Sequence, residues 1–215
     1  MNLLVASRNK HKLEEIRAIF NLPDIILLGA NEIPGLPEVV EDGSTFHANA
    51  VKKAVTLAMH AHLWTIADDS GLEVDALGGA PGVHSARYAG EPADYAANNT
   101  KLLKELEGVT ARSARFWCVI ALSSPAGRAQ IVEGKCEGQI IDELRGKEGF
   151  GFDPLFVPDG HLQTFAEMEA GLKNSISHRA RALQQAKENW NAVLASGEND
   201  WPRIISPEQR PKLRR

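Results

Sequence analysis

Short apolar runs alternate with segments of helical period from the beginning of the chain almost to its end. Residues 3–6, 25–28 and 64–67 are apolar runs typical of buried strands. Between them, residues 13–20 and 46–61 carry apolar side chains at the spacing of an amphipathic helix, with Ser44 or Thr45 as the expected cap of the second. Alternating strands and helices predict an α/β fold.

The second half of the chain predicts an antiparallel portion of the sheet. Residues 116–122 and 129–141 read as longer strands, and residues 124–127 between them have the residue types of a hairpin turn. One helix is expected over residues 94–106. A long last helix follows the apolar period of residues 176–193 and ends at Gly197. We therefore expect one domain over residues 1–197 and a solvated, basic, Pro-containing tail over residues 198–215.

Composition excludes several classes of protein. The chain has 215 residues, of which 43% are hydrophobic, enough for one globular domain with its own core. A formal net charge of −4 argues against a main role in holding nucleic acid, although the basic tail leaves nucleic-acid contact as a weaker alternative. Cys118 and Cys136 do not form a zinc motif and are expected to be buried free thiols. No apolar run approaches the roughly 20 residues that span a bilayer, so we expect a cytoplasmic protein without membrane contact.

Two adjacent acids, Asp68 and Asp69, directly follow the third apolar run. Acids at a strand end lie at the edge where open α/β sheets bind ligands. Carboxylate oxygens suit magnesium, and magnesium suits phosphates. Successive side chains of an extended chain point to opposite faces, so we expect different roles for the two acids. The alternative without chemistry is a turn cap through Ser70-Gly71.

Further segments have residue types that bind anions or bases. Residues 7–12 lie between the first strand and the first helix, where free N–H groups and two lysines favour a phosphate, although the segment has no glycine and is not a P-loop. Residues 173–181 group basic and hydroxyl side chains near the beginning of the last helix. In residues 149–154 two Phe rings are expected on one side of an extended segment, one stacking on a base and the other in the core. Each segment can also be read as polar loop or solvated helix. Glu38, Glu41 and Asp42 form an acidic loop.

The motifs of acyl transfer, zinc hydrolysis and nicotinamide chemistry are absent from the sequence. The residues by themselves thus indicate phosphate chemistry without naming a substrate.

A series of motifs in one order identifies a family resemblance. They are Ser7-x-Asn9-x-x-Lys12, Thr45-Phe46 with Asn49-Ala50-x-x-Lys53-Ala54, Ile66-Ala67-Asp68-Asp69-Ser70-Gly71-Leu72, Leu77-Gly78-Gly79-Ala80-Pro81-Gly82, Ser85-Ala86-Arg87-Tyr88, Gly149-Phe150-Gly151-Phe152-Asp153-Pro154 and Ser175-x-Ser177-His178-Arg179. From residue 2 to about residue 195 the chain closely resembles the inosine triphosphate pyrophosphatase family. The resemblance implies a central mixed sheet with flanking helices, two lobes around a nucleotide cleft, and a homodimer. It also implies Mg2+-dependent hydrolysis of the deaminated purine nucleotides ITP, dITP and XTP to the monophosphate and pyrophosphate, which cleanses the nucleotide pool.

The resemblance also implies roles for individual residues. Asp69 is the implied general base and a magnesium ligand, with Asp68 and Glu41 as further metal ligands. The implied substrate-binding residues are Ser7, Arg8, Asn9, Lys10, His11, Lys12, Lys53, Ser70 and Lys173, of which Ser7, Asn9, Lys12 and Lys53 hold the triphosphate. By the same resemblance Phe150, Gly151, Phe152 and Asp153 line the base pocket, and His178 with Arg179 reads the 6-oxo edge of the base. The chain departs from the family at His11 and Ala48, where Gly and Glu are common.

Two alternative functions are set against this expectation. One is a pyrophosphatase acting on modified pyrimidine nucleotides, as in the similarly folded Maf-like proteins. The other is a nucleotide sensor that binds without hydrolysis, motivated by the altered first loop and by the acid that Ala48 replaces.

Overall fold

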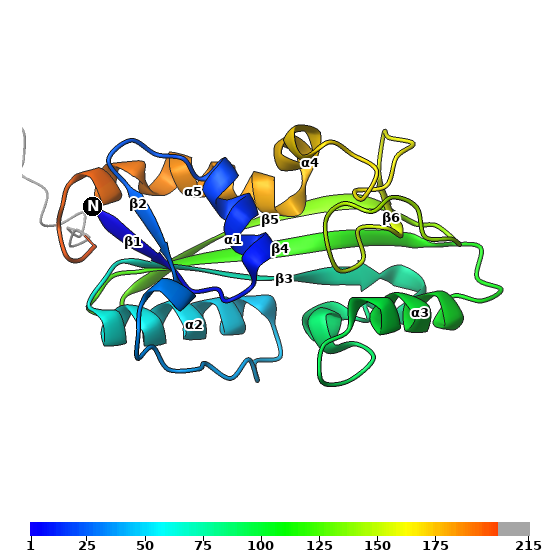
Figure 1. Cartoon of the computed structure of the whole chain (residues 1–215), viewed down its shortest axis with the longest axis horizontal. Helices are drawn as coiled ribbons and strands as arrows, with labels where there is room; N and C mark the ends of the chain where they lie inside the picture. The colour runs from blue at the N-terminus through cyan, green and yellow to red at the C-terminus, as the bar shows by residue number, and fades with distance from the viewer. Residues whose placement is uncertain (202–215) are drawn as a thin grey trace, which may run out of the picture.

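One mixed sheet organises the computed structural model, which describes residues 1–201. Its six strands lie in the order β2-β1-β3-β4-β5-β6. The first three strands, β1 (Asn2–Val5), β2 (Ile26–Gly29) and β3 (Thr65–Val74), are parallel to one another. The other three, β4 (Ser113–Ser123), β5 (Ala129–Ile140) and β6 (Phe156–Pro158), follow in chain order, and each is antiparallel to the strand before it. The strands β3, β4 and β5 extend through the whole length of the molecule (Figure 1). The predicted α/β class with an antiparallel portion is confirmed.

Helices cover both faces of this sheet. In Figure 1, α1 (Lys10–Ile19), α4 (Ala170–Ile176) and α5 (His178–Ala195) lie above it, and α2 (Phe46–Ala61) and α3 (Tyr95–Glu105) lie below. Short 3-10 turns, η1 (Ala30–Glu32), η2 (Asp75–Leu77) and η3 (Gly82–Arg87), connect them. Polar side chains cap the helices that begin near the cleft: Asn9 accepts from Lys12 N, and Thr45 accepts from Ala48 N. None of the helices within residues 1–201 combines the length and the apolar character needed to cross a membrane.

Strand alternation divides the core between the two faces. On β3, Ile66 belongs to the cluster under α1 and α5, and the next residue, Ala67, belongs to the cluster under α2. A third cluster around Phe116 and Phe156 fills the end of the molecule that carries α3 and β6, which we call the far lobe (Figure 1). Because side chains alternate, Asp68 continues the face of Ile66 and Asp69 continues the face of Ala67.

The prediction that the acid pair ends its strand is wrong. Strand β3 runs uninterrupted from Thr65 to Val74, because β4 pairs with it along this entire length. The neighbour on the other side stops earlier, since β1 ends at Val5, opposite Ile66. The acids therefore lie in mid-strand, just beyond the carboxyl end of β1. The extended segment expected up to residue 77 is also shorter, because Asp75–Leu77 forms η2.

The last helix begins later than the apolar period indicates. Ile176 ends α4, and Ser177 is extended (φ −66°, ψ 162°), so its side chain caps α5 by accepting from Ala180 N. Of the predicted tail, residues 198–201 are described, and residues 202–215 lie outside the described part of the chain. Trp201 is buried against Trp64, and Trp64 Nε1 donates to the Glu198 carbonyl at 2.8 Å.

Candidate active site

The two adjacent acids of β3 are both buried but serve opposite faces of the sheet. Asp68 is 2% exposed and points toward α1 and α5, whereas Asp69 is 5% exposed and points toward α2. The expectation that the two side chains point to opposite faces is confirmed, and their surroundings differ in the number of partners that each carboxylate finds.

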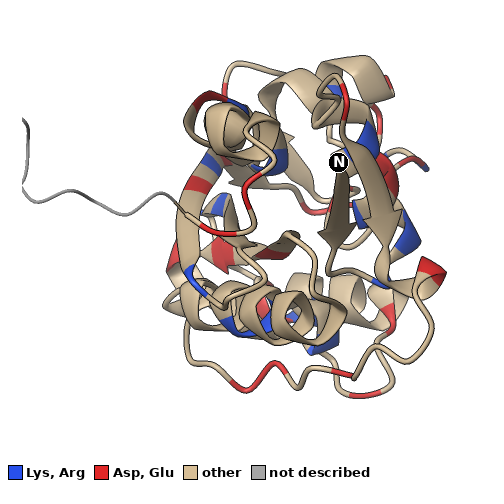
Figure 2. Ribbon diagram, turned by 90° about the vertical axis from the view of Figure 1, so that its left-hand side faces the viewer, with Lys and Arg blue, Asp and Glu red and all other residues tan. Residues whose placement is uncertain are grey.

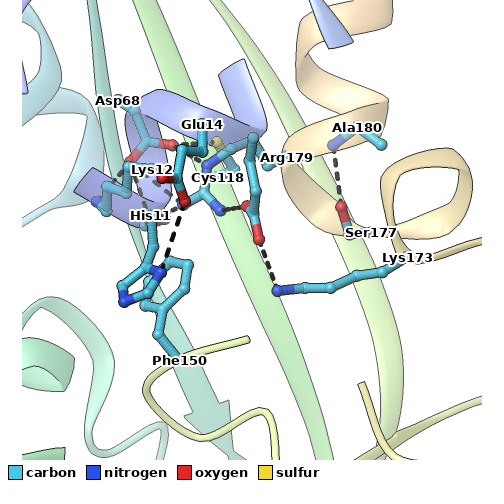
Figure 3. A network of polar contacts seen from close by, with 12 residues as sticks. His11, Lys12, Glu14, Asp68, Cys118, Phe150, Lys173, Ser177, Arg179 and Ala180 are labelled. Carbon is cyan, nitrogen blue, oxygen red and sulfur yellow. Dashed lines mark hydrogen bonds and ion pairs between the residues drawn. The ribbon is translucent and has the colours of Figure 1, made fainter. Parts of the chain in front are cut away.

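Asp68 is the acceptor at the centre of a buried polar network (Figure 3). Its Oδ2 accepts from Arg179 Nε at 3.0 Å and from the Cys118 thiol at 2.9 Å, and its Oδ1 accepts from Lys12 Nζ and from Ser70 Oγ at 3.1 Å. Burial by itself would raise the pKa of Asp68, but the cations of Arg179 and Lys12 hold that pKa well below its ordinary value. A carboxylate with this many donors stays ionised and is a poor proton acceptor.

Asp69 has the opposite character. Its Oδ2 is buried and finds no hydrogen-bond partner among residues 1–201. The nearest cation, Lys53 Nζ, lies 3.7 Å from Asp69 Oδ1 but 2.8 Å from Glu41 Oε1, and it also donates to the Asp68 carbonyl at 2.7 Å. Burial raises the pKa of Asp69 despite the nearby Lys53. An orphaned buried oxygen indicates a place for a ligand, a proton or an ion.

A half-buried glutamate on α1, Glu15, pairs with two predicted substrate-binding cations. Lys173 Nζ lies 2.6 Å from Glu15 Oε1 and 2.7 Å from Asp153 Oδ2, and Arg179 Nη1 pairs with the other oxygen of Glu15. Burial opposes ionisation of Glu15, but the charges of Arg179 and Lys173 lower its pKa below the ordinary value. The helix that follows the expected phosphate loop is thereby coupled to α4 and α5.

The two Phe rings of residues 149–154 separate instead of sharing one side. Gly151 has φ +65°, so the segment is a turn and not the extended chain that was expected. Phe152 is 2% exposed in the core of the far lobe, and Phe150 is half-buried. Asp153 Oδ2 accepts from Phe150 N at 2.8 Å and closes the turn. The interpretation that one ring belongs to the core is confirmed for Phe152.

His178 is buried against aromatic rings. Its imidazole stacks on Phe116 with centroids 4.7 Å apart and an interplanar angle of 12°. Burial and the Arg179 charge lower the pKa of His178 well below its ordinary value, so the ring is neutral at neutral pH. Its Nδ1 is buried without a partner within residues 1–201, which leaves one ring nitrogen for a ligand.

These segments converge on one cavity between the lobes. From the predicted set, the cavity is lined by Asn9, Lys12, Glu41, Asp69, Ser70, Phe150, Gly151, Phe152, Asp153, Lys173, His178 and Arg179. Two of its lining residues are hydrogen-bonded to each other, because Asn9 Nδ2 donates to the Tyr95 hydroxyl at 3.1 Å. A second hollow on the phosphate-loop side is lined by Ser7, Arg8, Asn9, Lys12, Glu41, Lys53 and Asp68. Lys10 lines neither hollow: its side chain is 85% exposed, and its Nζ lies 3.8 Å from Glu14 Oε1.

Comparison with known proteins decides the family. Residues 3–189 match the model of the Ham1 family. The chain belongs to the Ham1 family. It is 52% identical to the dITP/XTP pyrophosphatase of Desulforamulus reducens over 92% of this chain and 100% of that protein, and 50% identical to that of Shouchella clausii over 94% and 98%. Among solved structures it is similar to the Ham1 proteins of Staphylococcus aureus, with 39% identity, a TM-score of 0.80 and coverage of 92% and 100%, and of Coxiella burnetii, with 41%, 0.81, 91% and 99%. The resemblance drawn from the motifs is confirmed.

The Ham1-family site contains residues that sequence reasoning missed. In the sequence Glu15 looks like a solvated acid of a charged helix turn, because its partners are far away in the chain. Lys173 is separated from it by 158 positions and Arg179 by 164. Cys118 reads only as an apolar strand residue. Tyr95 lines the cavity without any local motif that marks it. Arg87 lines it as well, and although it belongs to the Ser85–Tyr88 motif, it was not selected as a site residue.

The expected metal ligands of this Ham1-family chain are brought together only in part. Glu41 and Asp69 share the cation of Lys53, whereas the Asp68 carboxylate points to the other face of the sheet. Within residues 1–201 no three His, Cys, Asp or Glu side chains converge as a ready-made metal cluster. The geometry thus separates Asp68 from the other two acids.

Proposed function

We propose that this chain hydrolyses the deaminated purine nucleotides dITP, XTP and ITP to the monophosphate and pyrophosphate, and so cleanses the nucleotide pool. The observation that carries the proposal is the cavity in which the orphaned oxygen of Asp69 lies beside lysine cations and an aromatic ring. An acid with an unpaired oxygen, anion-binding groups and an aromatic ring on which a base can stack are the three parts that such a reaction needs. Relatives that match almost the whole chain are named dITP/XTP pyrophosphatases, which supports the same substrates here.

Asp69 is the proposed general base. Water attacks the α-phosphorus in line, its proton passes to Asp69, and the bond from the α-phosphorus to the bridging oxygen breaks to release pyrophosphate. The buried, under-bonded oxygen and the raised pKa of Asp69 make it a better proton acceptor than the fully bonded Asp68. No covalent intermediate is required.

The triphosphate is proposed to bind between the first loop and α2. Lys12 and Lys53 supply positive charge, and Asn9 caps α1, whose free N–H groups and dipole favour an anion. In the free protein these lysines are neutralised by Asp68 and Glu41. Phosphate oxygens would therefore replace carboxylates that already hold the lysines in place, which limits the ordering cost of binding.

Magnesium fits the acids on the α2 face. Glu41 and Asp69 would hold it, because both already face one cation and Asp69 Oδ2 lacks a partner. When bound, Mg2+ would neutralise negative charge on the phosphates. Asp68 is not proposed as a ligand, because its oxygens are used by Arg179, Lys12, Ser70 and Cys118.

The purine base is proposed to stack on Phe150, with Asp153 and Lys173 at its edge. His178 and Arg179 are proposed to recognise the 6-oxo group. An inosine or xanthine base offers an acceptor there, whereas the 6-amino group of adenine is a donor and would leave a buried donor unpaired. The family also suggests a homodimer working in the cytoplasm, and sedimentation of the purified chain tests the dimer.

A substrate panel tests the proposal. Steady-state rates are measured with Mg2+ on ITP, dITP, XTP, GTP, ATP, TTP and UTP, and pyrophosphate is distinguished from orthophosphate. We expect pyrophosphate, fastest from the deaminated purines, and loss of activity with a chelator. A pyrimidine optimum would support the Maf-like alternative instead, and tight ITP binding without pyrophosphate release would support the sensor.

A further inference from the structure

The ring of Phe150 separates two hollows of different character. On one side is the cavity that contains Asp69, His178 and Arg179. On the other is a hollow of about 650 Å³ between α1, α4 and the turn at residue 149, lined by acids and by His11. Phe150 and Lys173 line both hollows, whereas His11 lines only the second.

His11 is the residue that lies parallel to the Phe150 ring. Their centroids are 5.4 Å apart and their planes differ by 12°, and Figure 3 shows the imidazole lying against the ring. Tyr95 also approaches Phe150, at 6.1 Å, but its plane is tilted by 44°. The Lys173 ammonium lies 5.2 Å from the Phe150 centroid. The guanidinium carbon of Arg179 lies 5.7 Å from the same centroid. Because the hydrogen bond to Asp153 fixes only the backbone of Phe150, the plane of the ring depends on its contacts with these side chains, among which His11 is the parallel ring.

Within residues 1–201, Phe150 is the one ring on which His11 stacks, and its other polar contact is weak. Its side chain is 54% exposed, and its one ionic neighbour, Glu14, lies 3.9 Å away. His11 belongs to the first turn of α1, so the helix fixes where its ring projects. Its neighbours in the loop, Asn9 and Lys12, line the cavity that holds Asp69, from which His11 is absent.

We propose that His11 is a positioning residue for the purine base: its ring backs Phe150 from the second hollow and fixes the plane on which the base stacks. This inference rests on the proposed function, because it assumes that a base occupies the cavity side of Phe150. Stacking depends on parallel planes, so a ring that holds Phe150 in orientation strengthens base binding without touching the nucleotide. His11 thereby belongs to the base site although it lies in the segment that was expected to bind phosphate.

Steady-state kinetics of His11 variants on ITP test the proposal. We expect His11→Ala to raise KM about 3- to 10-fold, the size expected for loss of one aromatic pair, and to leave kcat unchanged. His11→Leu, which keeps bulk but has no ring, should match His11→Ala, and His11→Phe should restore the wild-type KM. Glu14→Gln is the matched control in the same helix turn and should leave both constants unchanged.

Inorganic tripolyphosphate distinguishes the base from the phosphates, because it competes at the phosphate site and has no base. Its inhibition constant should be the same for the wild type and for His11→Ala. An inhibition constant that rises together with KM would make His11 a phosphate contact and overturn the proposal. An unchanged KM would overturn it as well, and a lowered KM would show that His11 occupies the place of the base.

Failure of the proposed function is separable from failure of this inference. A wild-type chain that releases no pyrophosphate from any nucleotide would refute the function. The same variants are then compared by the dissociation constant of ITP, in which the ring-dependent order is expected to persist. Melting temperatures of the variants confirm that each is folded.

Discussion

Neutralising the two adjacent acids of β3 is expected to change stability in opposite directions. Asp68→Asn removes the negative charge between two buried cations, and its amide would turn donors toward Arg179 or Cys118, which are donors themselves. Asp69→Asn removes a buried charge that lacks a full set of partners. The first change leaves buried charge uncompensated, and the second relieves it.

The magnitude follows from the network around each side chain. Breaking a buried ion pair by removing one partner costs about 3–5 kcal/mol, so Asp68→Asn should lower the free energy of unfolding by about that amount. For a domain of this size, that corresponds to a melting temperature lower by about 6–20 °C. Asp69→Asn should raise the free energy of unfolding, because burial raises the pKa of Asp69 and the native state therefore disfavours its ionised form at neutral pH.

Urea unfolding of both variants at neutral pH, analysed by linear extrapolation, measures the difference directly. The pKa of Asp68 is lowered in the native state, so its stabilising contribution is present above the unfolded pKa and is lost as pH falls through the folded value. The pKa of Asp69 is raised, so the sign is reversed. Equal effects of the two substitutions would refute the assignment of the acids to different surroundings.

Three further predictions concern single contacts. Hydrogen bonds from Arg128 and Ser124 lower the pKa of Asp200 from 3.8 to about 2, so the stability difference between the wild type and Asp200→Asn should be constant above pH 4 and disappear as pH falls toward 2, as followed by thermal melts. Cys118→Val removes a donor to Asp68 and should cost about 1–3 kcal/mol more in urea unfolding than Cys118→Ser, whereas the same two exchanges at Cys136, whose thiol contact is 3.8 Å, should differ less. Tyr95→Phe removes the 3.1 Å bond that ties up Asn9 and should lower the KM for ITP by up to about fivefold in steady-state assays, because the Asn9 amide is then free for the phosphates; a higher KM would mean that the hydroxyl binds substrate.

Local chemistry made most of the fold predictable. Thr45 caps α2 and the turn before Arg128 joins β4 to β5, and both follow from residue types within a few positions. The continuation of β3 through Asp68 and Asp69 was not predictable, because it depends on the antiparallel partner β4. That strand lies far along the chain: Cys118, whose thiol donates to Asp68, is 50 positions away from it. The break before α5 was hidden because Ile176 continues the apolar period of the following helix.

The site was predictable in membership more than in arrangement. Lys12 could be selected from the sequence because a helix N-terminus favours ligands. Asp69 was selected as a strand-end acid, and it lies in mid-strand, just beyond the carboxyl end of the neighbouring β1. The partner of each side chain could not be predicted, since Arg179 reaches Asp68 across 111 positions of chain. In the structure the Asp68 carboxylate accepts from Lys12 and Arg179, and its position in the sequence shows neither contact.

The central claim is that Asp69 is the base of a nucleotide pyrophosphatase, and its most direct test is pyrophosphate release from ITP by the wild type and by Asp69→Asn. We expect the substitution to leave ITP binding within about tenfold but to lower kcat by a factor of roughly 100 to 10,000, as for loss of a general base. Near-normal release of pyrophosphate by Asp69→Asn would contradict the account.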